Sequence, residues 1–155
     1  YIEQQTFDIE LLIEDTIAEA NLTVSTHLIN FRQCRSIMVN ADRDKIGSVI
    51  SNYLSNAVKY SPKGKNIEVG CETTDSEVIV SIKDEGMGIK PGDLDKIFDR
   101  YYRVETNHTR HIAGFGIGLY LSSEIIERHG GKVWAVSQSG TGSTFYFSLP
   151  LTGVE

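Results

Sequence analysis

The sequence has few cysteines, no long apolar run and no excess of positive charge, and each absence narrows the class of protein. Cys34 and Cys71 stand far apart and match neither a zinc-binding nor a redox spacing, so we expect buried or free thiols in a reducing compartment. No apolar run approaches the roughly 18 residues that span a bilayer, and no signal-peptide pattern is present. With a net charge of −6 and no basic stripe, the chain is a poor candidate for binding nucleic acid or an anionic membrane.

What remains is the composition of an ordinary globular domain. The 155 residues are 40% hydrophobic and 23% charged, which suits one domain with a real core. The chain begins without an initiator Met, and we expect residues 1–155 to be a single domain cut from a longer, cytoplasmic or membrane-anchored protein, with this part in the cytoplasm.

Hydrophobic periodicity divides the chain into helices and strands that are segregated along the sequence. Helices are predicted at 8–20, 43–60, 93–97 and 117–129. Strands are predicted at 26–31, 36–40, 66–73, 76–84, 132–138 and 143–150. Residues 99–113 are polar and lack a period, which predicts a loop. This order favours an α+β fold, a two-layer sandwich with helices on one face of a mixed sheet of about five strands.

Three glycines alternate with apolar residues in "GFGIGL" (114–119), directly before a predicted helix. Glycines at a helix N-terminus often hold phosphate, because free N–H groups and the helix dipole attract anions. The sequence does not match three common phosphate-binding motifs, however: the P-loop, the dinucleotide-binding fingerprint and the motifs of eukaryotic-type protein kinases. No G-x-x-x-x-G-K-[ST] string exists, Leu119 replaces the third glycine of the dinucleotide fingerprint, and H-R-D and D-F-G are absent. Alone, the motif fits a linker and a ligand loop about equally.

The helix at 43–60 carries a polar stripe beside its apolar face. Asn52, Asn56, Lys59 and Tyr60 follow the spacing i, i+4, i+7, i+8, and on a wheel of about 100° per residue they border the core face. An amide oxygen suits Mg²⁺, a lysine suits phosphate, and an aromatic ring can cover a base. The alternative is an ordinary solvated face, which the stripe alone does not exclude.

A carboxylate ends the predicted strand at 76–84, where "DEGMGI" (84–89) follows. The ionised Asp84 side chain only accepts hydrogen bonds, so it suits an exocyclic amine such as that of adenine. Gly86 and Gly88 would let a flat base approach the backbone. Aspartate and glycine are also common turn residues, and in isolation a plain turn is the better interpretation.

Taken together, these motifs resemble the catalytic ATP-binding domain of two-component sensor histidine kinases, which belongs to the Bergerat-fold ATPases. "NYLSNAVKYSP" resembles the family's N box, "DEGMGI" its first glycine box and "GFGIGL" its second. "IFDRYYRV" resembles the phenylalanine box, with Tyr101 where Phe is more usual, and "GTGSTFYFSLP" the closing box. The resemblance covers about residues 40–150 and agrees in order and spacing.

The resemblance implies ATP and Mg²⁺ as cofactors and assigns roles to particular residues. Asn56 would hold Mg²⁺ with support from Asn52, Lys59 would contact a phosphate, and Tyr60 would pack on the adenine or ribose. Asp84 would bind the adenine amine, directly and through a water network that Thr144 on the closing strand would join. Residues 99–113 would form a mobile lid. The remaining implied nucleotide contacts are Gly86, Gly88, Ile89, Tyr102, Arg103, Gly114, Phe115, Gly116, Ile117, Gly118, Leu119 and Thr144.

The implied activity is phosphoryl transfer from Mg-ATP to a histidine, with Asn52 and Arg103 as catalytic residues and Arg103 at the terminal phosphate or the partner domain. None of the four histidines fits the acceptor, which should lie on a helix before an acidic residue: His27, His108, His111 and His129. His129 precedes helix-ending glycines and is predicted to be structural. The acceptor is therefore expected on upstream dimerisation helices, and a response regulator is the expected partner of the whole kinase.

Two other functions stay in view. A hydrolysing relative of the gyrase or chaperone type would carry a general-base glutamate one turn before the metal-binding asparagine, and here that position is Asn52, an amide that cannot take a proton. A non-catalytic ATP-binding or interaction module remains compatible with intact motifs.

Overall fold

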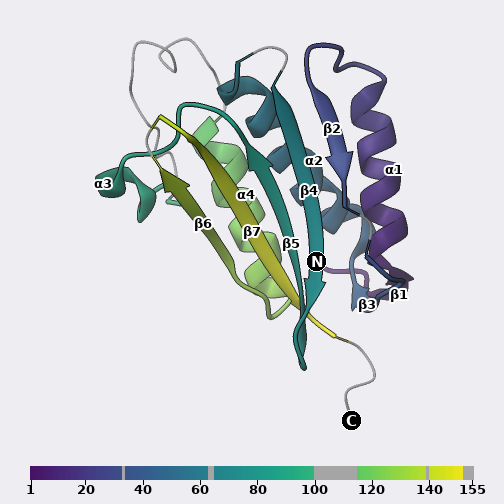
Figure 1. Cartoon of the computed structure of the whole chain (residues 1–155). Helices are drawn as coiled ribbons and strands as arrows, with labels where there is room; N and C mark the ends of the chain where they lie inside the picture. The colour runs from purple at the N-terminus through teal and green to yellow at the C-terminus, as the bar shows by residue number, and fades with distance from the viewer. Residues whose placement is uncertain (33, 63–64, 100–114, 139, 152–155) are drawn as a thin grey trace.

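The computed structural model describes residues 1–32, 34–62, 65–99, 115–138 and 140–151, leaving aside the side chains of 115–117. In this part of the chain, helices lie against one face of a sheet (Figure 1). The elements follow in the order β1 (Gln5–Asp8), α1 (Ile9–Asn21), β2 (Leu28–Phe31), β3 (Met38–Ala41), α2 (Arg43–Tyr60), β4 (Asn66–Thr73), β5 (Glu77–Asp84), α3 (Pro91–Leu94), α4 (Phe115–Arg128), β6 (Val133–Gln138) and β7 (Gly142–Pro150).

The main sheet has the strand order β2-β4-β5-β7-β6, and a separate two-stranded sheet pairs β1 with β3. β2 and β4 run parallel, whereas the other neighbours of the main sheet are antiparallel. This confirms the predicted α+β architecture with a mixed sheet of five strands. The register sets Asp84 of β5 opposite Ser143 of β7, so the end of β5 lies beside the start of β7.

Alternation of side chains along the strands decides which face of the sheet is covered. On β5, Val78, Val80 and Ile82 are buried while the residues between them are more exposed, as expected for a sheet with one covered face. Figure 1 shows α2 and α4 behind this sheet, with α1 beside α2 at the β2 edge. The core thus lies between the helices and one face of the sheet.

Helix α2 is held to the centre of the sheet by Tyr53. This side chain is almost fully buried, and its ring packs edge-on against Phe145 and Phe147 of β7, with centroids 5.7 and 6.0 Å away. Its hydroxyl donates to the Tyr146 carbonyl at 3.2 Å, which satisfies the polar atom of a buried tyrosine. This packing fixes the distance between α2 and the strands that follow it in space.

Most predicted bounds differ from the structure by no more than two residues, and two short elements differ more. β1 was not predicted, because its sequence QTFD has only Phe7 buried and shows no apolar alternation. The short helix α3 begins at Pro91 and ends at Leu94, earlier than the predicted 93–97. Proline favours the first position of a helix, where its missing N–H is not needed, so Pro91 starts the helix.

His129 joins α4 to the beginning of α2, which confirms that it is structural. Its Nε2 accepts from the Asp42 backbone N–H at 3.0 Å, and its Nδ1 lies 2.7 Å from the Ile125 carbonyl. A backbone N–H can only donate, so Nε2 must be unprotonated and Nδ1 carries the hydrogen. Asp42 also caps α2 by accepting from the Lys45 N–H at 3.2 Å.

Among the described residues, no helix combines the length and the apolar character needed to cross a bilayer.

We predict that His129→Ala destabilises the fold without reaching the pocket described below. The change removes both hydrogen bonds of a buried ring and leaves the Asp42 N–H without its acceptor, which costs about 1–3 kcal/mol. Urea unfolding measures the loss. The exposed neighbour Glu127 offers a matched control, and a Glu127→Ala loss as large as that of His129→Ala would contradict the bridging role.

Candidate functional site

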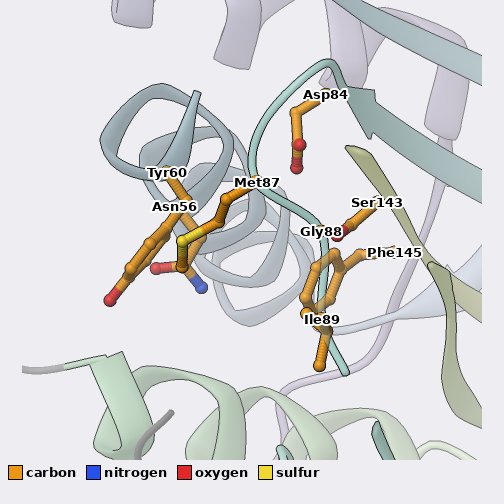
Figure 2. Close-up of a pocket in the computed structure, with 8 residues that line it drawn as sticks. All are labelled: Asn56, Tyr60, Asp84, Met87, Gly88, Ile89, Ser143 and Phe145. Atoms are coloured by element: carbon orange, nitrogen blue, oxygen red, sulfur yellow. The ribbon is translucent and has the colours of Figure 1, made fainter. Parts of the chain in front are cut away.

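A pocket opens where the C-terminal half of α2, the end of β5 and the start of β7 meet. Its lining mixes one carboxylate with apolar side chains and small polar groups: Asn56, Tyr60, Asp84, Met87, Gly88, Ile89, Ser143 and Phe145. Figure 2 shows the Asp84 carboxylate pointing into the space between the α2 side chains on one side and Ser143 and Phe145 on the other. Such a pocket, apolar with a few placed polar groups, is typical of a small-molecule site.

Asp84 is the buried acid of this pocket, with 6% of the residue exposed. Its Oδ1 accepts from the Gly86 N–H at 2.8 Å, and the carboxylate also accepts from the Ser143 backbone N–H. Burial raises the pKa of Asp84 above its ordinary value, while these two N–H donors act in the opposite direction. The two donors hold the carboxylate in place and leave it acceptor capacity for a ligand.

The loop after Asp84 is fastened to its neighbours by main-chain hydrogen bonds. The Met87 N–H donates to the Tyr60 carbonyl at 3.4 Å, and the Gly140 N–H donates to the Met87 carbonyl at 2.7 Å. Gly86 lies so close to α2 that a Cβ there would stand 2.2 Å from the Tyr60 carbonyl oxygen and 2.9 Å from Asp84 Oδ1. Only glycine allows this approach, so the sequence "DEGMG" builds one wall of the pocket.

A pair of serines fixes the opposite wall. Ser137 of β6 accepts from the Ile89 N–H at 2.6 Å, and its hydroxyl lies 2.9 Å from that of Ser143. Ser137 also donates to the Gly142 carbonyl at 3.1 Å. These bonds tie the end of the glycine loop to β6 and β7, so Ile89, itself buried, is held as an apolar surface of the pocket.

The polar stripe of α2 divides between three environments. Asn56, 9% exposed, and Tyr60 line the pocket. Asn52 faces α4 instead, where its amide donates to the Ser122 hydroxyl at 3.3 Å. Lys59 is exposed. The helical spacing therefore identified a stripe that borders the core, and two of its four members reach the pocket itself.

The structure brings five of the predicted contacts together at the pocket, namely Asn56, Tyr60, Asp84, Gly88 and Ile89, with Gly86 directly behind Asp84.

Thr144 is the exception on the closing strand, and its predicted place beside Asp84 is wrong. Thr144 pairs with Lys83, so its side chain lies on the opposite face of the sheet, while Ser143 pairs with Asp84. Because strand side chains alternate, a one-residue difference moves the group across the sheet. Ser143 takes the position that was assigned to Thr144.

Three pocket residues were missed by the sequence analysis: Met87, Ser143 and Phe145. A pattern could have found the last two. Phe145, Phe147 and Leu149 alternate as buried residues on β7, and Ser143 shares their parity whereas Thr144 does not. Met87 stands between two glycines of "DEGMGI", where no periodicity reports the direction of a side chain.

Predictions on the second glycine box are only partly within the described residues. Leu119 is 0% exposed and belongs to the hydrophobic core, so its side chain supports α4 from inside. A Cβ on Gly118 would lie 3.9 Å from the Asn52 side chain, in ordinary contact. Phe115, Gly116 and Ile117 are in α4, but the side chains of 115–117 are not described. Tyr102, Arg103, Gly114 and residues 100–113 of the predicted lid lie outside the described residues.

The donor chemistry of the pocket fits a hard cation that needs few protein ligands. No group of three or more His, Cys, Asp or Glu side chains that could hold a metal occurs in the described parts of the chain. The Asn56 amide supplies a single neutral oxygen. Mg²⁺ commonly takes one or two protein oxygens and fills its remaining positions with water and substrate phosphates, so Asn56 could hold it together with a phosphorylated ligand.

The sequence was compared with known protein families and with curated proteins. Residues 41–153 match the model of the histidine kinase-, DNA gyrase B- and HSP90-like ATPases. The chain is 43% identical to the sensor histidine kinase WalK of Bacillus subtilis over 118 residues, which are 75% of this chain and 19% of WalK. It is 38% identical to the sensor protein SrrB of Staphylococcus aureus over 122 residues, 79% of this chain and 21% of SrrB. The chain thus spans about a fifth of the length of these curated relatives.

Solved structures agree in fold. The nucleotide-free catalytic domain of the histidine kinase ThkA matches with a TM-score of 0.81 and 26% identity, covering 96% of this chain and 98% of that one. The mycobacterial sensor histidine kinase MprB matches with a TM-score of 0.83 at 23% identity, covering 96% and 98%. With the family model covering most of the sequence, the chain belongs to the histidine kinase-, DNA gyrase B- and HSP90-like ATPases, and has the Bergerat fold of the catalytic domains of histidine kinases.

Proposed function

We propose that this chain binds Mg-ATP and donates the γ-phosphoryl group to a histidine on separate dimerisation helices of a two-component sensor kinase. The observation that carries the proposal is the buried Asp84 carboxylate, held by two backbone N–H groups in a pocket lined by apolar side chains and a few polar ones. The curated relatives include the sensor histidine kinase WalK and the sensor protein SrrB, which supports this activity over others in the family.

Adenine recognition would follow from the chemistry of the slot. The carboxylate accepts from the exocyclic amine of adenine, and Ile89, Met87 and Phe145 supply apolar walls for the ring. Gly88 has a positive φ of 73°, a conformation that favours glycine. The backbone beside the base therefore carries no side chain at this position. Ser143 pairs with Asp84 across β5 and β7. Its hydroxyl would join Asp84 in holding water molecules at the adenine amine.

The phosphates and the metal would lie toward α4. Asn56 would hold Mg²⁺, Asn52 would support it from the α2–α4 contact, and Lys59 would meet a phosphate oxygen. The metal would neutralise charge on the phosphates. Tyr60 would pack beside the adenine or ribose, and the α4 N-terminus would favour phosphate through its free N–H groups.

Other roles rest on the sequence motifs: Arg103 and Tyr102 would act from the lid at 99–113, with Gly114, Phe115, Gly116, Ile117, Gly118 and Leu119 closing at the phosphates.

Hydrolysis is the weaker alternative because of the residue at position 52. A water-activating base there would need to take a proton, and the Asn52 amide instead donates to Ser122 at 3.3 Å. Transfer to a histidine needs no such base, because the acceptor imidazole is itself the nucleophile. We further propose that residues 1–155 act as one catalytic domain in the cytoplasm, where ATP is supplied, with upstream helices of the same protein and a response regulator as partners.

Asp84→Asn tests the adenine site directly. The amide presents an N–H₂ group or a weaker acceptor to the adenine amine, so loss of a charged hydrogen bond of about 1.5–3 kcal/mol lowers the ATP affinity between about ten- and a hundredfold. Isothermal calorimetry with ATP and Mg²⁺ measures it. Asp75→Asn, at an exposed turn, is the matched control and leaves the affinity unchanged. An ATP affinity of Asp84→Asn equal to that of the wild type would contradict the assignment of Asp84 to adenine recognition.

Asp84→Asn also tests how the ionisation of Asp84 contributes to the pH dependence of folding stability. Because the folded-state pKa of Asp84 is raised, the folded chain binds a proton more readily than the unfolded chain, and this stabilising contribution is lost as pH rises through the raised pKa. The free energy of unfolding of the wild type relative to Asp84→Asn should therefore increase as pH falls from about 7 toward about 4. Urea unfolding of both proteins at the two pH values measures this difference, and a decrease would show that the carboxylate is favoured in the fold.

Transfer is tested by adding γ-labelled ATP to the chain together with the dimerisation helices of its parent protein. The expected product is an acid-labile, alkali-stable phosphoryl group on a histidine of those helices. Asn56→Ala should lower its rate of formation at least about tenfold by weakening the metal site, whereas Ser55→Ala, an exposed neighbour on α2, should not. ATP binding without label would favour a binding module, and release of inorganic phosphate without label would favour hydrolysis.

A further inference from the structure

Two cysteines far apart in the sequence lie together at the β2 side of the sheet. Cys71 is on β4, and Cys34 follows β2 in the connection to β3. Both are free thiols, and each thiol influences the pKa of the other, so their side chains lie near each other. The parallel pairing of β2 with β4 brings them side by side, so the arrangement is a product of topology and not of sequence spacing.

Bonds on either side of the thiol pair hold the two segments in register. The Arg32 N–H donates to the Val69 carbonyl at 2.9 Å, before Cys34 and Cys71 respectively. The Arg35 guanidinium donates to the Thr73 hydroxyl at 3.4 Å, after them. The chain from β2 therefore continues along β4 past the cysteines, and the two thiols lie between these two bonds.

The two thiols differ in access, which sets the order in which they would react. Cys34 is partly exposed, whereas Cys71 is 8% exposed. Burial raises the pKa of the Cys34 thiol, and nearby Glu10 and Asp8 add to this effect. Burial raises the pKa of Cys71 further. The raised pKa values slow oxidation because the thiolate is the reacting form, and the more exposed Cys34 is the thiol that an external oxidant reaches first.

We propose that Cys34 and Cys71 are a redox-active dithiol that is converted to an intramolecular disulfide by low-molecular-weight disulfides. The Cys34 thiolate attacks one sulfur of oxidised glutathione and forms a mixed disulfide, releasing one glutathione as thiol. Cys71 then loses its proton and attacks the Cys34 sulfur, releasing the second glutathione. The chain loses two protons and two electrons, and one oxidised glutathione becomes two reduced ones.

The disulfide would enclose the whole of α2, which lies between the two cysteines in the sequence. This helix carries Asn56 and Tyr60 of the pocket. A cross-link between its two flanks restricts the unfolded chain over a long loop, so the oxidised chain resists unfolding more than the reduced one. The modification therefore adds a redox-dependent clamp to the part of the fold that carries the pocket, whatever the pocket binds.

The experiment is equilibration of the whole chain with mixtures of reduced and oxidised glutathione, followed by acid quenching, alkylation and peptide mass spectrometry. The expected result is a population of linked peptides that contain Cys34 and Cys71, lighter by two hydrogens and restored by dithiothreitol. The thermal midpoint of the oxidised chain should lie about 5 °C or more above that of the reduced chain.

Single variants supply the controls. Cys71→Ser should accumulate glutathione on Cys34, and Cys34→Ser should remain mostly unmodified because Cys71 is buried. Two free thiols in the wild type at strongly oxidising ratios, or only a stable mixed disulfide on Cys34, would overturn the proposal. A lower thermal midpoint in the oxidised chain would overturn the clamp on α2.

Discussion

The packing of α2 on the sheet is the contact on which the rest of the site depends. Tyr53 anchors the helix against Phe145 and Phe147. Asn56 and Tyr60, which follow it about one and two turns later on α2, are thereby set opposite Asp84. Burial of large aromatic side chains of this kind contributes about 1.5–3 kcal/mol each. The apolar face of α2 is therefore the reason that its polar edge has a fixed position, and His129 fixes the other end of the helix through Asp42.

Asp84 shows how a stable fold accommodates a destabilising group. Burial disfavours its charged form, and the N–H groups of Gly86 and Ser143 offset this only in part, since the pKa remains raised. A residue kept in such a place at a cost in stability is a candidate for function. Glycine is required next to it because the loop runs against the Tyr60 carbonyl, so one close backbone contact supports both the carboxylate and the pocket wall.

Much of the fold was predictable because its long elements have strong periods. The apolar face of α2 and the alternation of β4 and β5 fixed those elements closely, with β4 and α2 predicted at their observed ends. The weakly patterned β1 was missed, and α3 was shifted because the role of Pro91 was not recognised. For the pocket, residue types found Asp84 and Asn56, but the choice of Thr144 ignored the parity of β7, which favours Ser143. The juxtaposition of Cys34 and Cys71 could not be read from spacing, because it depends on which strands pair.

The central claim is that a carboxylate acceptor at Asp84 selects the base, and a comparison of ATP with GTP measures this most directly. Guanine presents a carbonyl oxygen where adenine presents its amine, and two acceptors facing each other leave a buried polar group without a donor. Calorimetric titration of the chain with each Mg-nucleotide should show ATP binding at least about tenfold more tightly than GTP, a preference that Asp84→Asn largely removes. Equal affinity of the wild type for ATP and GTP would contradict the account.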